Sequence, residues 1–184
     1  MPAADAYKSL VPPDEMLSKI QSEETEFSFL LFAVPTPGRE KIPGTNKYEM
    51  EEWIAFVFSA LRKYYSSKFG QSKEFNSQFA GEIFGEALFN AVGHGNRFHP
   101  EKLTKLGVWL GSKGTIFAIE DEGNFFKDES IKNKILSRSH IKSTATQETG
   151  GGGTGGLEYI YQTDEIAIEG NTLFLMVTAN RFFE

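Results

Sequence analysis

Apolar residues recur along the chain with spacings that change from strand-like to helical. Residues 27–34 (FSFLLFAV) form a dense apolar run that is closed by prolines, which predicts a buried strand followed by a loop to about residue 46. From residue 48 the apolar positions recur at helical spacing and predict an amphipathic helix that ends before Gly70. A second helix is predicted over residues 74–93, where Ala87, Leu88 and Ala91 belong to an apolar stripe.

Four later β-rich runs predict two antiparallel hairpins. The first pair covers residues 106–110 and 115–120, the second covers residues 165–168 and 173–178, and a glycine-containing turn joins each pair. Helices combined with hairpins indicate an α+β fold. We therefore predict a two-layer α/β sandwich, with helices on one face of a mixed, largely antiparallel sheet.

Between the hairpins the pattern dissolves into polar, Lys-rich and Thr-rich sequence. The stretch begins after Asp121 and ends in the glycine run of residues 150–156, before a short predicted helix over residues 157–161. A loop of this length inside a compact domain is usually functional or disordered. We expect one domain over residues 27–184, preceded by an N-terminal tail or loosely docked arm over residues 1–26, which lack a sustained apolar period.

Composition narrows the functional classes. The 184 residues are 40% hydrophobic and 24% charged, as in ordinary globular proteins, and the net charge of −6 does not favour a broad nucleic-acid-binding face. The chain has no cysteine and three histidines, so a zinc site is not expected, and His94 is expected to cap or pack. Since no apolar run is long enough to span a membrane, we expect no membrane contact and a cytoplasmic location.

The second predicted helix carries the first candidate for chemistry, in the segment EALFNAVGHGN. Glu86 and Asn90 are four residues apart, so their side chains share one helix face. An Asn oxygen can ligate Mg²⁺, and a carboxylate can accept a proton. A solvated polar face is the ordinary explanation of such a pair. However, Gly81, Gly85 and Gly93 beside it cost about 1 kcal/mol each in a helix interior, which favours a face that another group approaches closely.

Two more segments carry candidate chemistry. Asp121 ends a predicted strand, where a carboxylate can accept a hydrogen bond from an exocyclic amine, and Gly123 lets a flat ring approach the backbone. An acidic turn after a strand is usually structural when it stands alone. The glycine run offers unobstructed N–H groups for phosphate, although a flexible linker is the ordinary alternative. Neither a Walker A loop nor the strand that a dinucleotide-binding fingerprint requires is present in the sequence.

Together and in this order, the three segments resemble the N, G1 and G2 boxes of the GHKL superfamily of gyrase, heat-shock chaperone, histidine kinase and mismatch-repair ATPases. The resemblance spans residues 81–175, and the E-A-x-x-N-A-x-x-H-G form of the first box is most similar to that of bacterial anti-sigma-factor serine kinases. The second box departs from the common D-x-G-x-G, because the sequence here is DEGNF. This resemblance implies the Bergerat fold, with ATP and Mg²⁺ as cofactors.

The resemblance also implies roles for the matching residues. Glu86 would be the general base and Asn90 the Mg²⁺ ligand, while Asp121 would accept from the adenine amine and Gly123 would let the base pack closely. The cofactor-binding set further contains Gly153, Gly155 and Gly156, which would present amides to the phosphates, Leu157 directly after them, and Arg138 or Lys142 in a lid over residues 127–142.

The function that this resemblance implies is ATP-dependent phosphorylation of a serine or threonine on a small partner protein, coupled to sequestering a sigma factor. Partners would be a sigma factor, an anti-anti-sigma-like protein or both, and a homodimer is an open alternative. Three other functions also remain. They are an ATP-gated protein-binding module with little turnover, the stand-alone catalytic domain of a two-component histidine kinase, and an interaction domain that binds no nucleotide.

Overall fold

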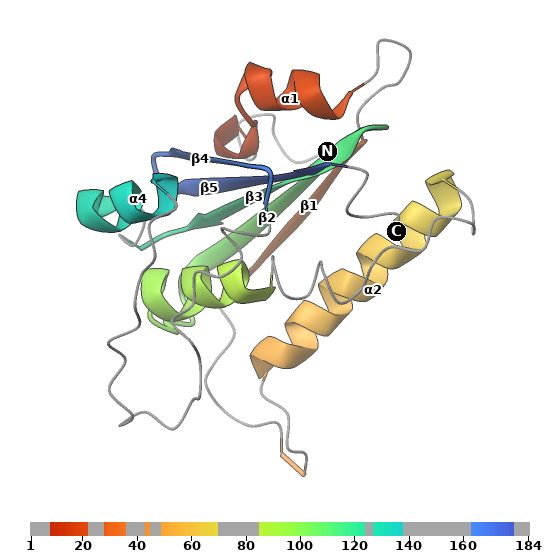
Figure 1. The fold of residues 1–184 in the computed structure, drawn as a ribbon. Coiled ribbons are helices and arrows are strands. Elements are labelled where there is room, and N and C mark those ends of the chain that lie inside the picture. The colour runs from red at the N-terminus through yellow and green to blue at the C-terminus, as the bar shows by residue number, and fades with distance from the viewer. Residues whose placement is uncertain are drawn as a thin grey trace.

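The computed structural model describes residues 8–21, 28–35, 43–44, 49–69, 85–123, 127–137 and 163–178. Over these residues the chain forms an α+β fold around an open five-stranded sheet, as expected from the sequence (Figure 1). The strands are β1 (Ser28–Pro35), β2 (Leu103–Leu110), β3 (Gly114–Asp121), β4 (Glu165–Glu169) and β5 (Thr172–Thr178).

The sheet order is β1-β2-β3-β5-β4, and each neighbouring pair is antiparallel. Both predicted hairpins are confirmed, with Leu106 opposite Ile119 in the first and Ile168 opposite Leu173 in the second. The expectation of a mixed sheet is wrong for the described strands, because none of their pairings is parallel. Since β3 lies at the centre, its two ends are flanked by elements from distant parts of the chain.

One face of the sheet carries the larger hydrophobic core. The helices that cover it are α2 (Glu49–Phe69), residues 85–90 with the π-helical turn η2 (Ala91–Gly95), and α4 (Glu129–Leu136). Ala87, Leu88 and Ala91 of the predicted stripe are fully buried here. Burying a side chain as large as that of Leu88 stabilises a fold by about 1.5–3 kcal/mol. None of the helices in the described segments has both the length and the apolar character needed to cross a membrane.

The opposite face is covered by α1 (Asp14–Ile20), together with the turn at residues 8–10 (Figure 1). Leu10, Met16 and Ile20 are fully or almost fully buried there, in one cluster with Ile116 and Phe174 of the sheet. Residues 8–21 of the expected tail or arm are therefore packed, and helices lie on both faces rather than one. The apolar period of α1 covers only two turns, so the sequence pattern was too short to predict the helix.

Helix α4 lies within the segment that was expected to be a loop. Asp128 caps its first turn, because its Oδ1 accepts from the backbone N–H of Ser130 at 2.9 Å and of Ile131 at 3.4 Å. Ile135 is fully buried in the larger core and Ile131 packs against it. A cap residue followed by apolar positions four apart is a helix pattern, but it is short and interrupted by lysines, so the loop prediction was wrong over residues 129–136.

Candidate functional site

The candidate site lies where the end of β3 meets η2. The backbone N–H of Asn96 donates to the carbonyl of Ala91, five residues earlier, at 2.8 Å. Such π-helical turns are rare in proteins, but many of those that occur are found at functional sites. This turn brings Gly95 against the carboxyl group of Asp121, so that a Cβ at Gly95 would overlap that group. Any side chain at Gly95 would have to displace the Asp121 carboxyl from this position.

A second glycine completes the contact from the β3 side. A Cβ at Gly123 would overlap the carbonyl group of Gly95, so the two backbones touch directly. The N–H of Gly123 donates to Oδ1 of Asp121 at 2.7 Å, which folds the turn back on its own carboxylate. The end of the first candidate segment and the acidic turn thus lie together, and Asp121 and Gly123 are adjacent to the same helix end.

The Asp121 carboxyl is buried and only partly satisfied. Asp121 is only 1% exposed, and this burial raises the pKa of its carboxyl from the ordinary 3.8 to about 6. The hydrogen bond from the Gly123 N–H and the positive charge of Lys102 oppose the increase. Within the described part of the chain, Oδ2 has no hydrogen-bond partner. Leaving a buried acceptor unpaired costs about 1–3 kcal/mol, and more for a charged group. Oδ2 can therefore accept one more hydrogen bond from an N–H or O–H donor that reaches it.

Two asparagines hold this turn from opposite sides. On the helix side, Asn96 Oδ1 accepts from the N–H of Glu122 at 2.8 Å, while its Nδ2 donates to the carbonyl of Leu103 at 2.9 Å. On the hairpin side, Asn171 Nδ2 donates to the carbonyl oxygens of Asp121 at 2.9 Å and of Gly123 at 2.7 Å. Neither asparagine was predicted from the sequence, because asparagine is common in turns for purely local reasons.

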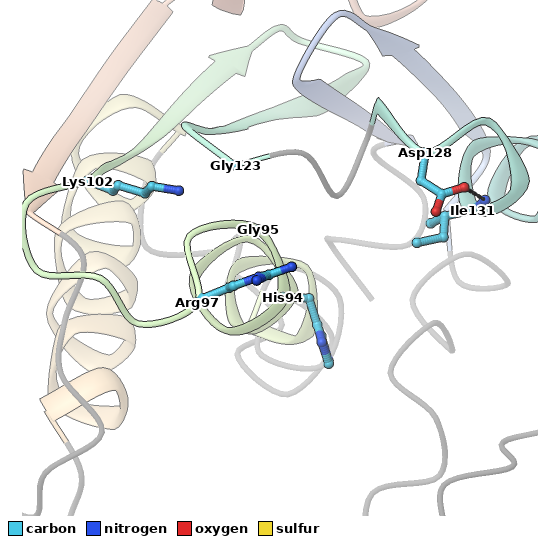
Figure 2. A pocket seen from close by; sticks show the side chains of 7 residues that line it. All are labelled: His94, Gly95, Arg97, Lys102, Gly123, Asp128 and Ile131. Carbon is cyan, nitrogen blue, oxygen red and sulfur yellow. Dashed lines mark hydrogen bonds between the residues drawn. The ribbon is translucent and has the colours of Figure 1, made fainter.

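A cavity of about 440 Å³ opens beside the turn, a size within the range of small-molecule sites. Its lining residues are His94, Gly95, Arg97, Lys102, Gly123, Asp128 and Ile131 (Figure 2). Lys102 extends from one side toward the space between Gly95 and Gly123, and Asp128 with Ile131 at the start of α4 lies across from it (Figure 2). Arg97 and Lys102 give the cavity two positive charges, which suits an anionic ligand.

Arg97 reaches the cavity from an unusual backbone segment. Arg97 and Phe98 have φ angles of 56° and 55°, in the left-handed region that non-glycine residues rarely adopt. The N–H of Phe98 donates to the carbonyl of Val92 at 2.9 Å, and its ring packs edge-on against Phe89 with centroids 5.9 Å apart. These contacts hold the segment in place. Arg97 and Lys102 were not predicted from the sequence, although both basic residues follow the first candidate segment closely.

Glu86 and Asn90 lie on the helix over residues 85–90 that leads into η2. Asn90 is buried at 3% exposure and Glu86 is half-buried, and neither is among the residues that line the cavity. The structure therefore brings Asp121, Gly123 and Gly95 together, but of these three only the two glycines line the cavity, and Asp121, Glu86 and Asn90 do not.

The glycines of this helix pack against protein instead of an open ligand face. Among the described residues, a Cβ at Gly85 would meet the Ile54 side chain of α2 at 3.9 Å, and one at Gly93 would meet the ring of Phe98 at 3.2 Å. The expected close approach of another group occurs at Gly93, where that group is the Phe98 ring, and also at Gly95, whereas the contact of Gly85 with Ile54 is of ordinary length. His94, which was expected to cap or pack, is exposed and lines the cavity.

The remaining predicted residues lie outside the described residues. They are Gly81, Arg138, Lys142, Gly153, Gly155, Gly156 and Leu157. No model of a known protein family matches the chain, and no curated protein matches it significantly.

Proposed function

We propose that this chain binds ATP with Mg²⁺ in the cavity beside Asp121 and acts as a regulatory serine/threonine protein kinase of the anti-sigma-factor type. The observation that carries the proposal is the buried Oδ2 of Asp121, which has no hydrogen-bond partner among the described residues. An adenine amino group supplies the missing donor. Gly95 and Gly123 pack against that carboxyl and its turn and also line the cavity, so a base seated on their backbones would lie next to Asp121.

The same carboxylate would discriminate between purines. Adenine presents an amino group at the position where guanine presents a carbonyl oxygen, and an ionised carboxylate accepts from the first and repels the second. Arg97 and Lys102 line the same cavity and favour an anionic ligand by their charge. These features support an adenine nucleotide over a neutral or guanine-based ligand.

The kinase part of the proposal concerns the helix that precedes η2. Glu86 is proposed as the base that accepts the proton of a serine or threonine hydroxyl, and Asn90 as a Mg²⁺ ligand through its side-chain oxygen. Bound ATP would supply the γ-phosphoryl group. The glycines at 153, 155 and 156, Leu157, and either Arg138 or Lys142 remain the proposed phosphate contacts, and a sigma factor or an anti-anti-sigma-like protein remains the proposed partner.

Transfer and binding can be separated with Glu86→Ala. Radiolabelled ATP is incubated with the chain and a small anti-anti-sigma-like protein, and calorimetry measures MgATP binding by the same samples. We expect the variant to bind MgATP within about threefold of wild type, whereas transfer falls by about 10²-fold or more, the usual contribution of a general base. Equal transfer by both proteins would remove Glu86 from this role.

One observation favours a second function, an ATP-gated protein-binding module with little or no kinase activity. Neither Glu86 nor Asn90 lines the cavity, so binding in it does not by itself require a base or a metal ligand from that helix. Nucleotide binding can then set partner affinity by ordering neighbouring segments. MgATP binding by the wild type without any transfer to the partner would select this function over the kinase.

A further inference from the structure

Asn171 links the β4–β5 hairpin to the turn that carries Asp121. The strands β3 and β5 pair up to Glu120 opposite Thr172, so Asp121 and Asn171 are the next residues beyond the ladder. At this point the side chain of Asn171 replaces the backbone pairing, because its Nδ2 donates to the carbonyls of Asp121 and Gly123. One amide group therefore holds both ends of the three-residue turn.

The side chain of Asn171 is directed to this turn and not to its own hairpin. Both hydrogen bonds of Nδ2 go to residues that are 48 and 50 positions away in sequence. Oδ1 is buried and has no partner among the described residues, so it gives the hairpin no side-chain bond there. Gly170, with a φ of 58°, supplies the left-handed position that the hairpin turn itself needs. A role confined to the hairpin does not explain these contacts.

We propose that Asn171 is a positioning residue for the Asp121 carboxyl, holding the Asp121–Gly123 turn closed so that this carboxyl stays buried against Gly95. Asn96 fixes the middle of the turn through the Glu122 N–H, and Asn171 fixes its two outer carbonyls. Without Asn171 the outer carbonyls need other donors, and water is the nearest source. The turn then opens, and water reaches the carboxyl. The consequence for nucleotide binding rests on the function proposed above, whereas the consequence for the carboxyl does not.

The test compares Asn171→Ala with Glu169→Ala, a control in the same hairpin at an exposed position. Carboxyl carbon NMR follows the titration of Asp121, and calorimetry measures MgATP affinity at pH 7.5. In Asn171→Ala we expect the pKa of Asp121 to fall from about 6 toward 3.8, since water reduces the cost of burying the charge. MgATP affinity should fall about tenfold, which is the change expected when one or two hydrogen bonds are lost. Glu169→Ala should match wild type in both measurements.

A purely structural role gives a different result. In that case Asn171→Ala lowers the melting temperature but leaves both the titration of Asp121 and the MgATP affinity unchanged, and the proposal is overturned. A lowered pKa in a protein whose wild type does not bind MgATP supports the positioning role and contradicts only the proposed function. If Asn171→Ala does not fold, Asn171→Ser is measured in the same way, because its shorter side chain cannot reach both carbonyls.

Discussion

The two ends of the central strand β3 are both packed through glycines, but they differ in how their polar groups are satisfied. At the Gly114 end, the N–H of Gly111 donates to the carbonyl of Gly114 at 3.0 Å. The N–H of Lys113 donates to the carbonyl of Ile20, at the end of α1, at 2.8 Å. A Cβ at Gly111 would overlap that same carbonyl. This end is a structural junction between the first hairpin and α1.

At the Asp121 end, glycines also bring two backbones into contact, yet one polar group is left over. Gly95 and Gly123 touch as closely as Gly111 and the Ile20 carbonyl do at the other end. The difference is the buried Oδ2 of Asp121, which has no donor within the described part of the chain. Tight glycine packing therefore does not by itself indicate a binding site, because it occurs at both ends. The feature that distinguishes the Asp121 end is the buried carboxylate oxygen without a partner in the described part of the chain.

The largest expected effect comes from adding a methyl group at each end. Gly123→Ala and Gly111→Ala both force a Cβ into a backbone carbonyl, so each should lower the free energy of unfolding by about 1–3 kcal/mol or more, as overpacking does. Only Gly123→Ala should also reduce MgATP affinity, by about 100-fold or more, because the added methyl group displaces the turn that carries the Asp121 carboxyl. Urea unfolding and calorimetry on both variants test this. A comparable loss of affinity in folded Gly111→Ala would remove the distinction between the two ends.

A smaller effect is expected from Asp121→Asn, measured as stability against pH. The folded state raises the pKa of Asp121 from 3.8 to about 6, so it favours the neutral carboxyl. The neutral carboxyl therefore contributes to the free energy of unfolding below about pH 4, and this contribution is lost as the pH rises to about 6. For a pKa shift of this size the loss is on the order of 3 kcal/mol. Asparagine does not titrate, so Asp121→Asn should gain this much relative to wild type between pH 4 and pH 7.

Urea unfolding at several pH values provides the measurement. The charged groups that act on Asp121 are Lys102, Lys127 and Glu120, and all three are unchanged in the variant. Parallel stability curves for wild type and Asp121→Asn across pH 4–7 would show that the carboxyl is not held neutral by burial. The contrast with the Gly114 end, where backbone hydrogen bonds join the hairpin to α1, would then disappear.

The smallest effect is expected from single charges near each end. Lys102→Met removes a cation that lines the cavity, so the pKa of Asp121 should rise further and MgATP affinity should fall about threefold to tenfold, with a smaller loss at high salt. Lys113→Met removes an exposed lysine at the Gly114 end and keeps its backbone bond to Ile20, so it should leave both quantities unchanged. Calorimetry at two salt concentrations distinguishes these outcomes, and equal effects of the two variants would assign the change to net charge alone.

Much of the sheet could be predicted from the sequence, because its strands are short runs rich in apolar residues and the turns of both hairpins contain glycine. Helix α2 follows from a helical period that extends over several turns. Helices α1 and α4 could not be predicted with the same method, because each has only two or three apolar positions at helical spacing. Their burial depends on surfaces that the sheet provides after it has formed.

The site could be predicted only in part for a related reason. Asp121 and Gly123 stand next to each other in an acidic turn after a strand, so a local motif marks them. Asn171 and Asn96 act on this turn from 50 and 26 positions away, and no local pattern records those pairings. The left-handed backbone conformation of Arg97 could not be predicted from the local sequence either, because the packing of Phe98 against Phe89 supports it.

The most direct test of the account is calorimetry of MgATP and MgGTP with wild type and Asp121→Asn at pH 7.5, where the wild-type carboxyl is ionised. If Oδ2 of Asp121 accepts from the base, wild type should bind MgATP at least about tenfold more tightly than MgGTP. Asp121→Asn should lose most of that preference, because its amide can also donate to the guanine carbonyl. Absence of MgATP binding by wild type, or the same ATP preference in both proteins, would contradict the assignment of Asp121 as the base-reading group.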